Sequence, residues 1–212
     1  ALVQPDRTNV ANLDGSDLKT VLTFTPVLKN DGQPYLPQVA WLSNSYGFKT
    51  VIPTADGSQP ARFLFVAAQG GQPAQLALIL AAPLSRGYFP YISASSDTVA
   101  YLRESGDNLE LHTIDASTAD KMLLSYPKDK FGLLGWGGDG VSLVCWVNDP
   151  AQTQLWRPDG SLIPLGGAPI IWLDATQYLS LVGSELRLGA LGQPGTVIDA
   201  GNITAFSGIS LP

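Results

Sequence analysis

One short phrase returns five times along this chain: an apolar strand that ends in an aromatic residue or isoleucine and runs into a small polar turn. The five copies occupy residues 39–43, 90–94, 134–140, 170–174 and 204–207. With Trp41, Ile92, Trp136, Trp172 and Phe206 as equivalent positions, successive copies lie 51, 44, 36 and 34 residues apart. Such repetition is typical of solenoids and propellers, in which each unit is a small sheet that cannot bury its own faces alone.

A second series of turns falls between these copies and joins apolar strands through glycine or small polar residues. Its members are residues 14–16, 70–72, 116–118, 159–161 and 192–194. The Asp-Gly and Gly-Gly pairs among them supply the positive φ of a tight hairpin, because glycine has no Cβ to clash. The two series alternate strictly, and the spacings bracket the roughly 40 to 50 residues of a four-stranded blade. The sequence therefore predicts an all-β propeller of four-stranded antiparallel blades.

The composition supports an all-β fold. Glycine (22 residues) and proline (16 residues) interrupt the chain every few positions, and no segment has apolar residues at helical spacing over three turns. Short segments rich in β-branched, aromatic and leucine residues are the expected strands. They are residues 22–24, 48–52, 63–67, 75–79, 99–102, 109–114, 143–147, 155–157, 178–182, 186–188 and 196–198.

Two segments carry a resemblance to a known repeat. Residues 12–19 read Asn-Leu-Asp-Gly-Ser-Asp-Leu-Lys, and residues 91–101 read Tyr-Ile-Ser-Ala-Ser-Ser-Asp-Thr-Val-Ala-Tyr. They resemble the repeats of TolB-type β-propellers, the first at the turn between a blade's two outer strands and the second at its two inner strands. The Ser-x-Asp-Gly turn of that repeat is absent after Trp41 and after Trp172. The resemblance implies the propeller fold and, by analogy, partners in the bacterial envelope or periplasm.

The two ends of the chain are expected to share one blade. The segment up to Leu22 resembles the blade's outer two strands, and residues 202–211 resemble its inner strand. Four intact repeats and this composite blade make five, and pairing the ends removes exposed sheet edges. Because one all-β domain reaches this length, residues 1–212 are expected to form a single domain. The alternative is that they are a part of a larger propeller or assembly.

The charge balance and the apolar segments argue against nucleic-acid binding and against a membrane span. The formal net charge is −6 and the twelve basic residues are scattered, whereas nucleic-acid binding requires clustered lysine and arginine. The longest apolar stretch, residues 76–84, is broken by Pro83 and is shorter than the ~18 residues that span a bilayer. Few lysines with abundant Gly, Ser, Thr, Gln and Pro suit an exported bacterial protein, so an extracytoplasmic location, periplasmic or secreted, is expected.

No set of residues selects a reaction. Cys145 lies in an apolar strand and is expected to be a buried hydrophobe. The only histidine, His112, shares a strand face with Glu110 and is expected at the surface or between blades rather than as a base. The acids that precede glycine are assigned to hairpin turns rather than to a carboxylate pair or a calcium loop: Asp14, Asp56, Asp139 and Asp159. No catalytic residue, cofactor site or metal ligand is assigned, and the sequence favours a non-enzyme.

The aromatic residues divide into core and surface candidates. Trp41, Trp136 and Trp172 recur with the repeat and are expected in the core. Two groups combine aromatics with arginine, as protein interfaces do, and are the candidate partner-binding residues: Arg86, Tyr88 and Phe89, and Trp156 and Arg157. Packing that covers sheet edges is the alternative explanation for both groups.

The function expected from these patterns is a non-catalytic scaffold that binds another protein, as part of a larger envelope-associated complex. The alternative function is that of a carbohydrate-binding or glycoside-cleaving propeller.

Overall fold

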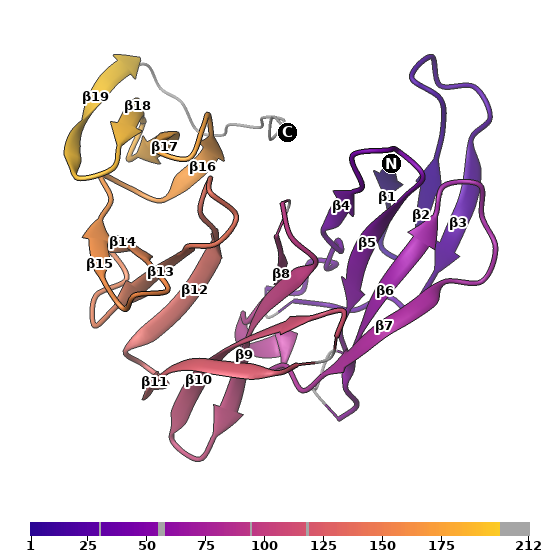
Figure 1. Ribbon diagram of the computed structural model, residues 1–212, viewed down its shortest axis with the longest axis horizontal. Coiled ribbons are helices and arrows are strands. Elements are labelled where there is room, and N and C mark those ends of the chain that lie inside the picture. Colours follow the sequence, from indigo (N-terminus) through magenta and orange to yellow (C-terminus); the bar gives the residue numbers. More distant parts are fainter. Residues whose placement is uncertain (30, 55–57, 94, 118, 200–212) are drawn as a thin grey trace. The chain divides into compact units, whose positions relative to one another are not determined.

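The computed structural model describes residues 1–199 except 30, 55–57, 94 and 118. The chain divides into two compact units, Ala1–Gly106 with Glu110–Ser125, and Asp107–Leu109 with Tyr126–Pro212. Each unit is built from antiparallel sheets whose strands follow one another in chain order (Figure 1). None of the described residues belongs to a helix long and apolar enough to cross a membrane. The expectation of a single domain stays a prediction.

The first unit contains one three-stranded sheet and two four-stranded sheets. Their strands are β1 (Leu2–Val3), β2 (Arg7–Val10) and β3 (Lys19–Thr23); β4 (Val39–Trp41), β5 (Gly47–Ile52), β6 (Ala61–Ala67) and β7 (Ala74–Ile79); and β8 (Tyr91–Ile92), β9 (Thr98–Ser105), β10 (Asn108–Asp115) and β11 (Lys121–Pro127). A short 3-10 helix, η1 (Leu84–Arg86), connects β7 to β8. Small parts of β10 and β11 belong to the second unit.

The second unit contains two further four-stranded sheets. The first consists of β12 (Phe131–Trp136), β13 (Leu143–Val147), β14 (Thr153–Trp156) and β15 (Leu162–Pro164), and the second of β16 (Pro169–Trp172), β17 (Gln177–Val182), β18 (Glu185–Ala190) and β19 (Gln193–Asp199).

The two repeating sequence series mark equivalent places in these sheets. The aromatic phrase supplies the first strand of each four-stranded sheet, namely β4, β8, β12 and β16, and the second series lies between the third and fourth strands. The predicted four-stranded blades are therefore confirmed. The turn of this series at residues 14–16 joins β2 to β3, which are therefore the third and fourth strands of a blade. Strand β1 then corresponds to the second strand. The predicted inner strand at residues 202–211 lies outside the described residues, and the closure of the composite blade stays a prediction.

Strand glycines in two sheets lie beneath an aromatic ring of the neighbouring strand. A Cβ atom on Gly132 would lie 2.2 Å from the Trp146 ring, and one on Gly189 would lie 2.3 Å from the Tyr178 ring. Both are directly paired positions, in β12–β13 and β17–β18. Because the ring covers the space that a side chain would take, only glycine fits there without displacing it.

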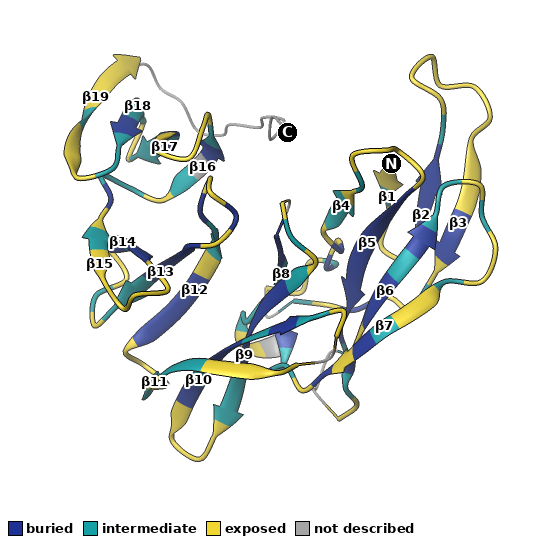
Figure 2. Cartoon of the chain, in the orientation of Figure 1, coloured by how far each residue is buried: buried dark blue, intermediate teal, exposed yellow. Residues whose placement is uncertain are grey.

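Apolar side chains from facing sheets form the core within each unit. In the first unit, Phe48 and Leu64 of the second sheet pack with Val10 and Leu22 of the first. Other side chains of the second sheet pack with Tyr101, Val99 and Ile114 of the third. In the second unit, Val144 and Leu155 pack with Tyr178. Figure 2 shows that the strands differ in burial: β5 is buried throughout, whereas β19 is almost wholly exposed.

The expectation that the repeated tryptophans lie in the core is wrong for Trp41, which is 38% exposed. Trp136 and Trp172 are only partly buried. The aromatic position is the last residue of its strand, where the chain turns into a polar loop. The Trp41 ring contacts that of Phe48 at a steep angle, with ring centroids 5.4 Å apart. Trp172 packs at the margin of the core cluster around Tyr178, whereas Trp41 lies largely outside the core.

Candidate interaction site

The loop between β7 and β8 carries three of the five predicted partner-binding residues. It begins with η1, and Gly87 ends that turn with a φ of +82° while its N–H donates to the Leu84 carbonyl over 2.9 Å. A positive φ is strained for other residue types, so glycine suits this position. The loop therefore presents Arg86, Tyr88 and Phe89 from a defined backbone turn.

The loop packs against the long connection between β3 and β4. The rings of Phe89 and Tyr35 stack 5.9 Å apart and are nearly parallel, at 4°. Val27 and Leu84 complete this apolar cluster. Burial raises the pKa of the Tyr35 hydroxyl well above its usual range, so the ring stays neutral. Two segments more than 50 residues apart are thus joined into one surface.

The two joined segments also expose apolar and cationic groups. Leu28 and Leu36, the chain neighbours of Val27 and Tyr35, are 54% and 52% exposed. The Arg86 side chain is 55% exposed, and its Nη1 lies 2.5 Å from Oε1 of Glu104. Together Leu28, Leu36, Arg86, Tyr88 and Phe89 are called here the aromatic-loop surface.

The other two predicted residues, Trp156 and Arg157, belong to the second unit. The Trp156 side chain is 6% exposed, and its indole nitrogen has no hydrogen-bond partner among the described residues. Arg157 is exposed at the start of the β14–β15 turn, where its N–H donates to the Ser161 carbonyl over 3.0 Å. Of this pair, only Arg157 offers exposed surface to a partner.

A buried polar network surrounds the only histidine. His112 is 4% exposed, so it is not a surface residue. Its Nδ1 lies 2.9 Å from Oδ1 of Asp120, and its Nε2 lies 3.0 Å from Oε2 of Glu110. The Tyr101 hydroxyl donates to the same Asp120 oxygen over 2.9 Å. The predicted shared face of His112 and Glu110 is confirmed, but sequence alone did not indicate Asp120, which lies beyond the β10–β11 turn.

The geometry of this network suits a structural role. Both imidazole nitrogens are engaged by carboxylates, so neither is free to contact a substrate. The hydrogen bond from His112, followed by one from Ser105, holds the pKa of the Glu110 carboxyl below its usual range. The two carboxylates lie on opposite ring nitrogens, and the described residues contain no group of three or more His, Cys, Asp or Glu side chains placed to hold a metal ion.

The aspartates assigned to turns do form turns wherever the structure describes them. Oδ1 of Asp14 accepts the N–H of Ser16 over 2.9 Å, and Oδ1 of Asp159 accepts that of Ser161 over 2.8 Å. Asp139 bonds to the N–H groups of Val141 and Ser142 in the same way. Asp56 lies outside the described residues. These carboxylates close hairpins, as Asx turns do.

The predicted burial of Cys145 is confirmed, since the residue is 0% exposed. Burial raises the pKa of its thiol to about 12. A thiol with such a pKa is protonated at neutral pH and is a poor nucleophile.

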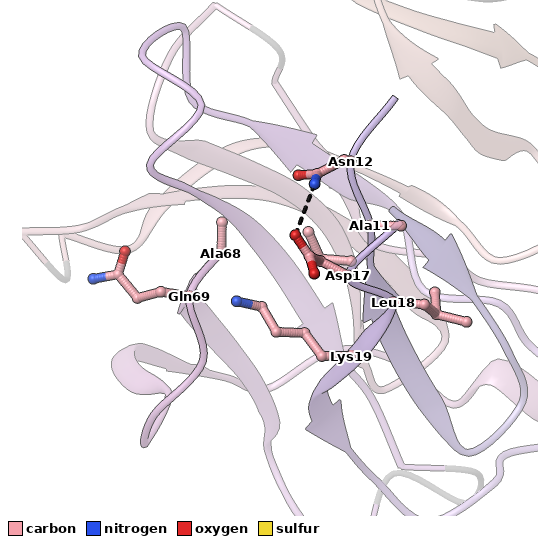
Figure 3. A pocket seen from close by; sticks show the side chains of 8 residues that line it. Ala11, Asn12, Asp17, Leu18, Lys19, Ala68 and Gln69 are labelled. Atoms are coloured by element: carbon pink, nitrogen blue, oxygen red, sulfur yellow. Dashed lines mark hydrogen bonds between the residues drawn. The ribbon is translucent and has the colours of Figure 1, made fainter. Parts of the chain in front are cut away.

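An open hollow lies beside the β2–β3 hairpin, at the β6–β7 turn (Figure 3). Its volume is about 540 Å³. Small apolar residues and four polar side chains line it: Val10, Ala11, Asn12, Asp17, Leu18, Lys19, Ala68 and Gln69. The sequence marks residues 12–19 as a turn but contains no signal that Ala68 and Gln69 lie against it.

Comparison with known proteins gives a likeness in structure but none in sequence. No protein-family model and no curated protein matches the chain. An oligogalacturonate lyase in complex with manganese is similar at a TM-score of 0.56 and 12% identity, over 89% of this chain and 54% of that one. TolB from Acinetobacter baumannii is similar at a TM-score of 0.44 and 11% identity, over 91% of this chain and 62% of that one. The chain therefore spans less than two thirds of either protein.

At sequence identities of 11% and 12%, a structural likeness shows the fold alone. Sequential four-stranded antiparallel sheets repeat through both units, as the blades of a propeller do. The chain therefore has a β-propeller fold.

Proposed function

We propose that this protein is a non-catalytic propeller that binds another protein through the aromatic-loop surface. The observation that supports this most strongly is the joining of the Arg86–Phe89 loop to the β3–β4 connection by the Tyr35–Phe89 stack. The stack holds the backbone on both sides in place while Leu28, Leu36 and Arg86 remain more than half exposed. A preordered surface loses less conformational entropy on binding than a mobile one.

The chemistry of the surface is that of a protein interface. Aromatic residues and arginine are enriched at interfaces, where they act as anchors surrounded by apolar contacts. Arg86 is already paired with Glu104, which fixes its guanidinium but leaves donors free for a partner's carboxylate or carbonyl groups. The partner is therefore expected to present apolar side chains with an acidic residue beside them. Arg157 in the second unit is a separate candidate contact.

The compartment belongs to the same proposal. The composition and the resemblance to TolB-type repeats support an extracytoplasmic location and a partner in a larger envelope-associated complex.

Site-specific photo-crosslinking tests the proposal. A photoreactive benzophenone amino acid is placed at Leu28, Leu36 or Met122 in the full chain, which is expressed in its source cells and irradiated. Met122 on β11 is the matched control, because it is an apolar residue of the same unit with a similar exposure of 54%. A discrete adduct with one protein is expected at Leu28 and Leu36 and absent at Met122.

A second variant separates specific contact from proximity. Arg86→Ser removes the charge from the surface without changing its apolar part, and is expected to reduce the Leu36 adduct several-fold while the circular dichroism spectrum stays unchanged. Equal adducts at Met122 and Leu36, or adducts that Arg86→Ser leaves intact, would argue against this surface as the binding site.

Carbohydrate binding is the second candidate function, and half-exposed aromatic rings of the second sheet favour it. Trp41 is 38% exposed and Tyr46 is 52% exposed, and exposed aromatic faces stack on sugar rings. The structural likeness to an oligogalacturonate lyase supplies the ligand to test first. Isothermal titration with galacturonate oligomers at two temperatures tests this function. Binding that Trp41→Ala abolishes would favour it, and the absence of heat at both temperatures would reject it.

A further inference from the structure

The tip of the β2–β3 hairpin exposes two large apolar side chains. Leu13 is fully exposed, and Leu18 is 58% exposed. Both belong to a polar turn, residues 11–18, that joins β2 to β3. Exposed apolar groups gathered beside a hollow are typical of interaction sites.

The turn that carries these leucines is held by its own side chains. Nδ2 of Asn12 donates to Oγ of Ser16 and to Oδ2 of Asp17, each over 2.9 Å. Oδ1 of Asp14 accepts the N–H of Ser16 over 2.9 Å. A preordered tip of this kind enters a partner's surface with little loss of conformational entropy.

Charges of opposite sign lie two residues apart beside the tip. Asp17 and Lys19 both line the hollow, and Figure 3 shows the carboxylate and the ammonium directed into it. Oδ2 of Asp17 accepts from Nδ2 of Asn12, whereas Oδ1 accepts no hydrogen bond from the described residues. Lys19 has neither an ion pair nor a side-chain hydrogen bond within the part of the chain that the structure describes. The hairpin tip thus carries a projecting leucine, and the hollow beside the hairpin is lined by an anion and a cation.

We propose that this face binds a second copy of the same chain across a two-fold axis. Leu13 of each copy enters the hollow of the other, against Val10, Ala11 and Ala68, and Lys19 of each copy pairs with Asp17 of the other. In a two-fold interface every contact occurs twice with the roles exchanged, so the face must be complementary to itself. A face with both a knob and a hollow, and with both charges, meets this condition. The proposal does not depend on the aromatic-loop surface, which uses other residues.

Sedimentation velocity of the purified full chain tests the proposal, over concentrations from about 1 μM to about 1 mM. A monomer–dimer equilibrium is expected in this range. Leu13→Asp is expected to raise the dissociation constant at least about tenfold, because it places a charge in the apolar part of the contact. The matched control is Leu78→Asp, another exposed leucine, 52% exposed on β7 of the same unit, which is expected to leave the dissociation constant unchanged.

A charge-exchange experiment identifies the paired residues. Lys19→Glu gives a face with two anions and Asp17→Lys gives one with two cations, so each variant alone is expected to be monomeric. When the two are mixed, the opposite faces match and a heterodimer is expected. Circular dichroism checks the fold of each variant. If Asp17→Lys does not fold, the dissociation constants of Lys19→Glu, Leu13→Asp and Leu78→Asp still decide whether this face forms the dimer. A chain that is monomeric at all concentrations, or a dimer that survives Leu13→Asp, overturns the proposal and leaves the face to a different partner.

Discussion

Gly189→Ala tests whether the glycine beneath an aromatic ring is required by the sheet. Its Cβ atom would lie 2.3 Å from Cζ of Tyr178, whereas ordinary contact begins at 3.4 Å. The ring must therefore move by about 1 Å. It has little room, because Tyr178 is 0% exposed, its ring lies 5.1 Å from that of Trp172, and its hydroxyl accepts the N–H of Gly166 over 2.8 Å.

The expected cost follows from these contacts. Overpacking a core position costs about 1–3 kcal/mol, and loss of the bond to Gly166 adds about 1 kcal/mol. Alanine recovers about 0.5–1 kcal/mol through its smaller loss of backbone entropy. The free energy of unfolding is therefore expected to fall by about 1–3 kcal/mol, measured by urea denaturation.

The matched control is Gly195→Ala in the adjacent strand β19. A Cβ atom there would lie 3.5 Å or more from its neighbours, at ordinary contact, so this variant is expected to be neutral or slightly stabilising. In a Tyr178→Leu background, where the ring is gone, Gly189→Ala is expected to cost nothing. Equal effects of Gly189→Ala and Gly195→Ala, or an unchanged cost in the Tyr178→Leu background, would refute the steric explanation.

Three further predictions follow from burial and charge. Cys145, whose thiol pKa is raised to about 12 by burial, is expected to react with a disulfide reagent only after the chain unfolds, and reaction of the folded protein at neutral pH would contradict this. Hydrogen bonds to Asp115 and Asp174 lower the pKa of these carboxyls in the folded state. These hydrogen bonds therefore stabilise the fold above about pH 4, and the stabilisation is lost as the pH falls further. A midpoint of urea denaturation that does not decrease below about pH 4 would contradict this prediction. Lys49 is buried and pairs with Asp97, whose side chain is 61% exposed. Because Lys49→Met leaves a solvated carboxylate behind, it is expected to change the free energy of unfolding by less than about 1 kcal/mol. A larger loss in the same urea assay would show that the ion pair stabilises the fold.

The strands that sequence analysis predicted are the ones with a strong apolar pattern between turn residues. Strands such as β5, β10 and β17 are buried on at least one face, so their apolar residues form a clear pattern. The ranges expected to be strands left out β1, β2, β11 and β15. Of these, β1 and β15 are short, β11 is largely exposed, and β2 has only one apolar residue, Val10. An exposed edge strand has no buried face to impose the pattern.

The candidate sites show a similar division. Alternation along β10 was sufficient to place Glu110 beside His112, because both lie on one strand. It could not bring Asp120 to the same ring, nor Tyr35 to Phe89, since those contacts depend on turns and on the packing of separate segments. The wrong placement of Trp41 in the core has the same origin, because a repeat fixes which positions are equivalent but not which side of the strand end faces solvent.

An experimental structure of the full chain tests most directly whether the repeats build five blades. The first sheet has three strands that correspond to the second, third and fourth strands of a blade, and we propose that residues 202–211 supply the first. The prediction is a fourth strand beside β1, hydrogen-bonded to Leu2 and Val3 and formed by the segment around Phe206. A first sheet that keeps three strands, or takes its fourth strand from elsewhere, would contradict the five-blade propeller.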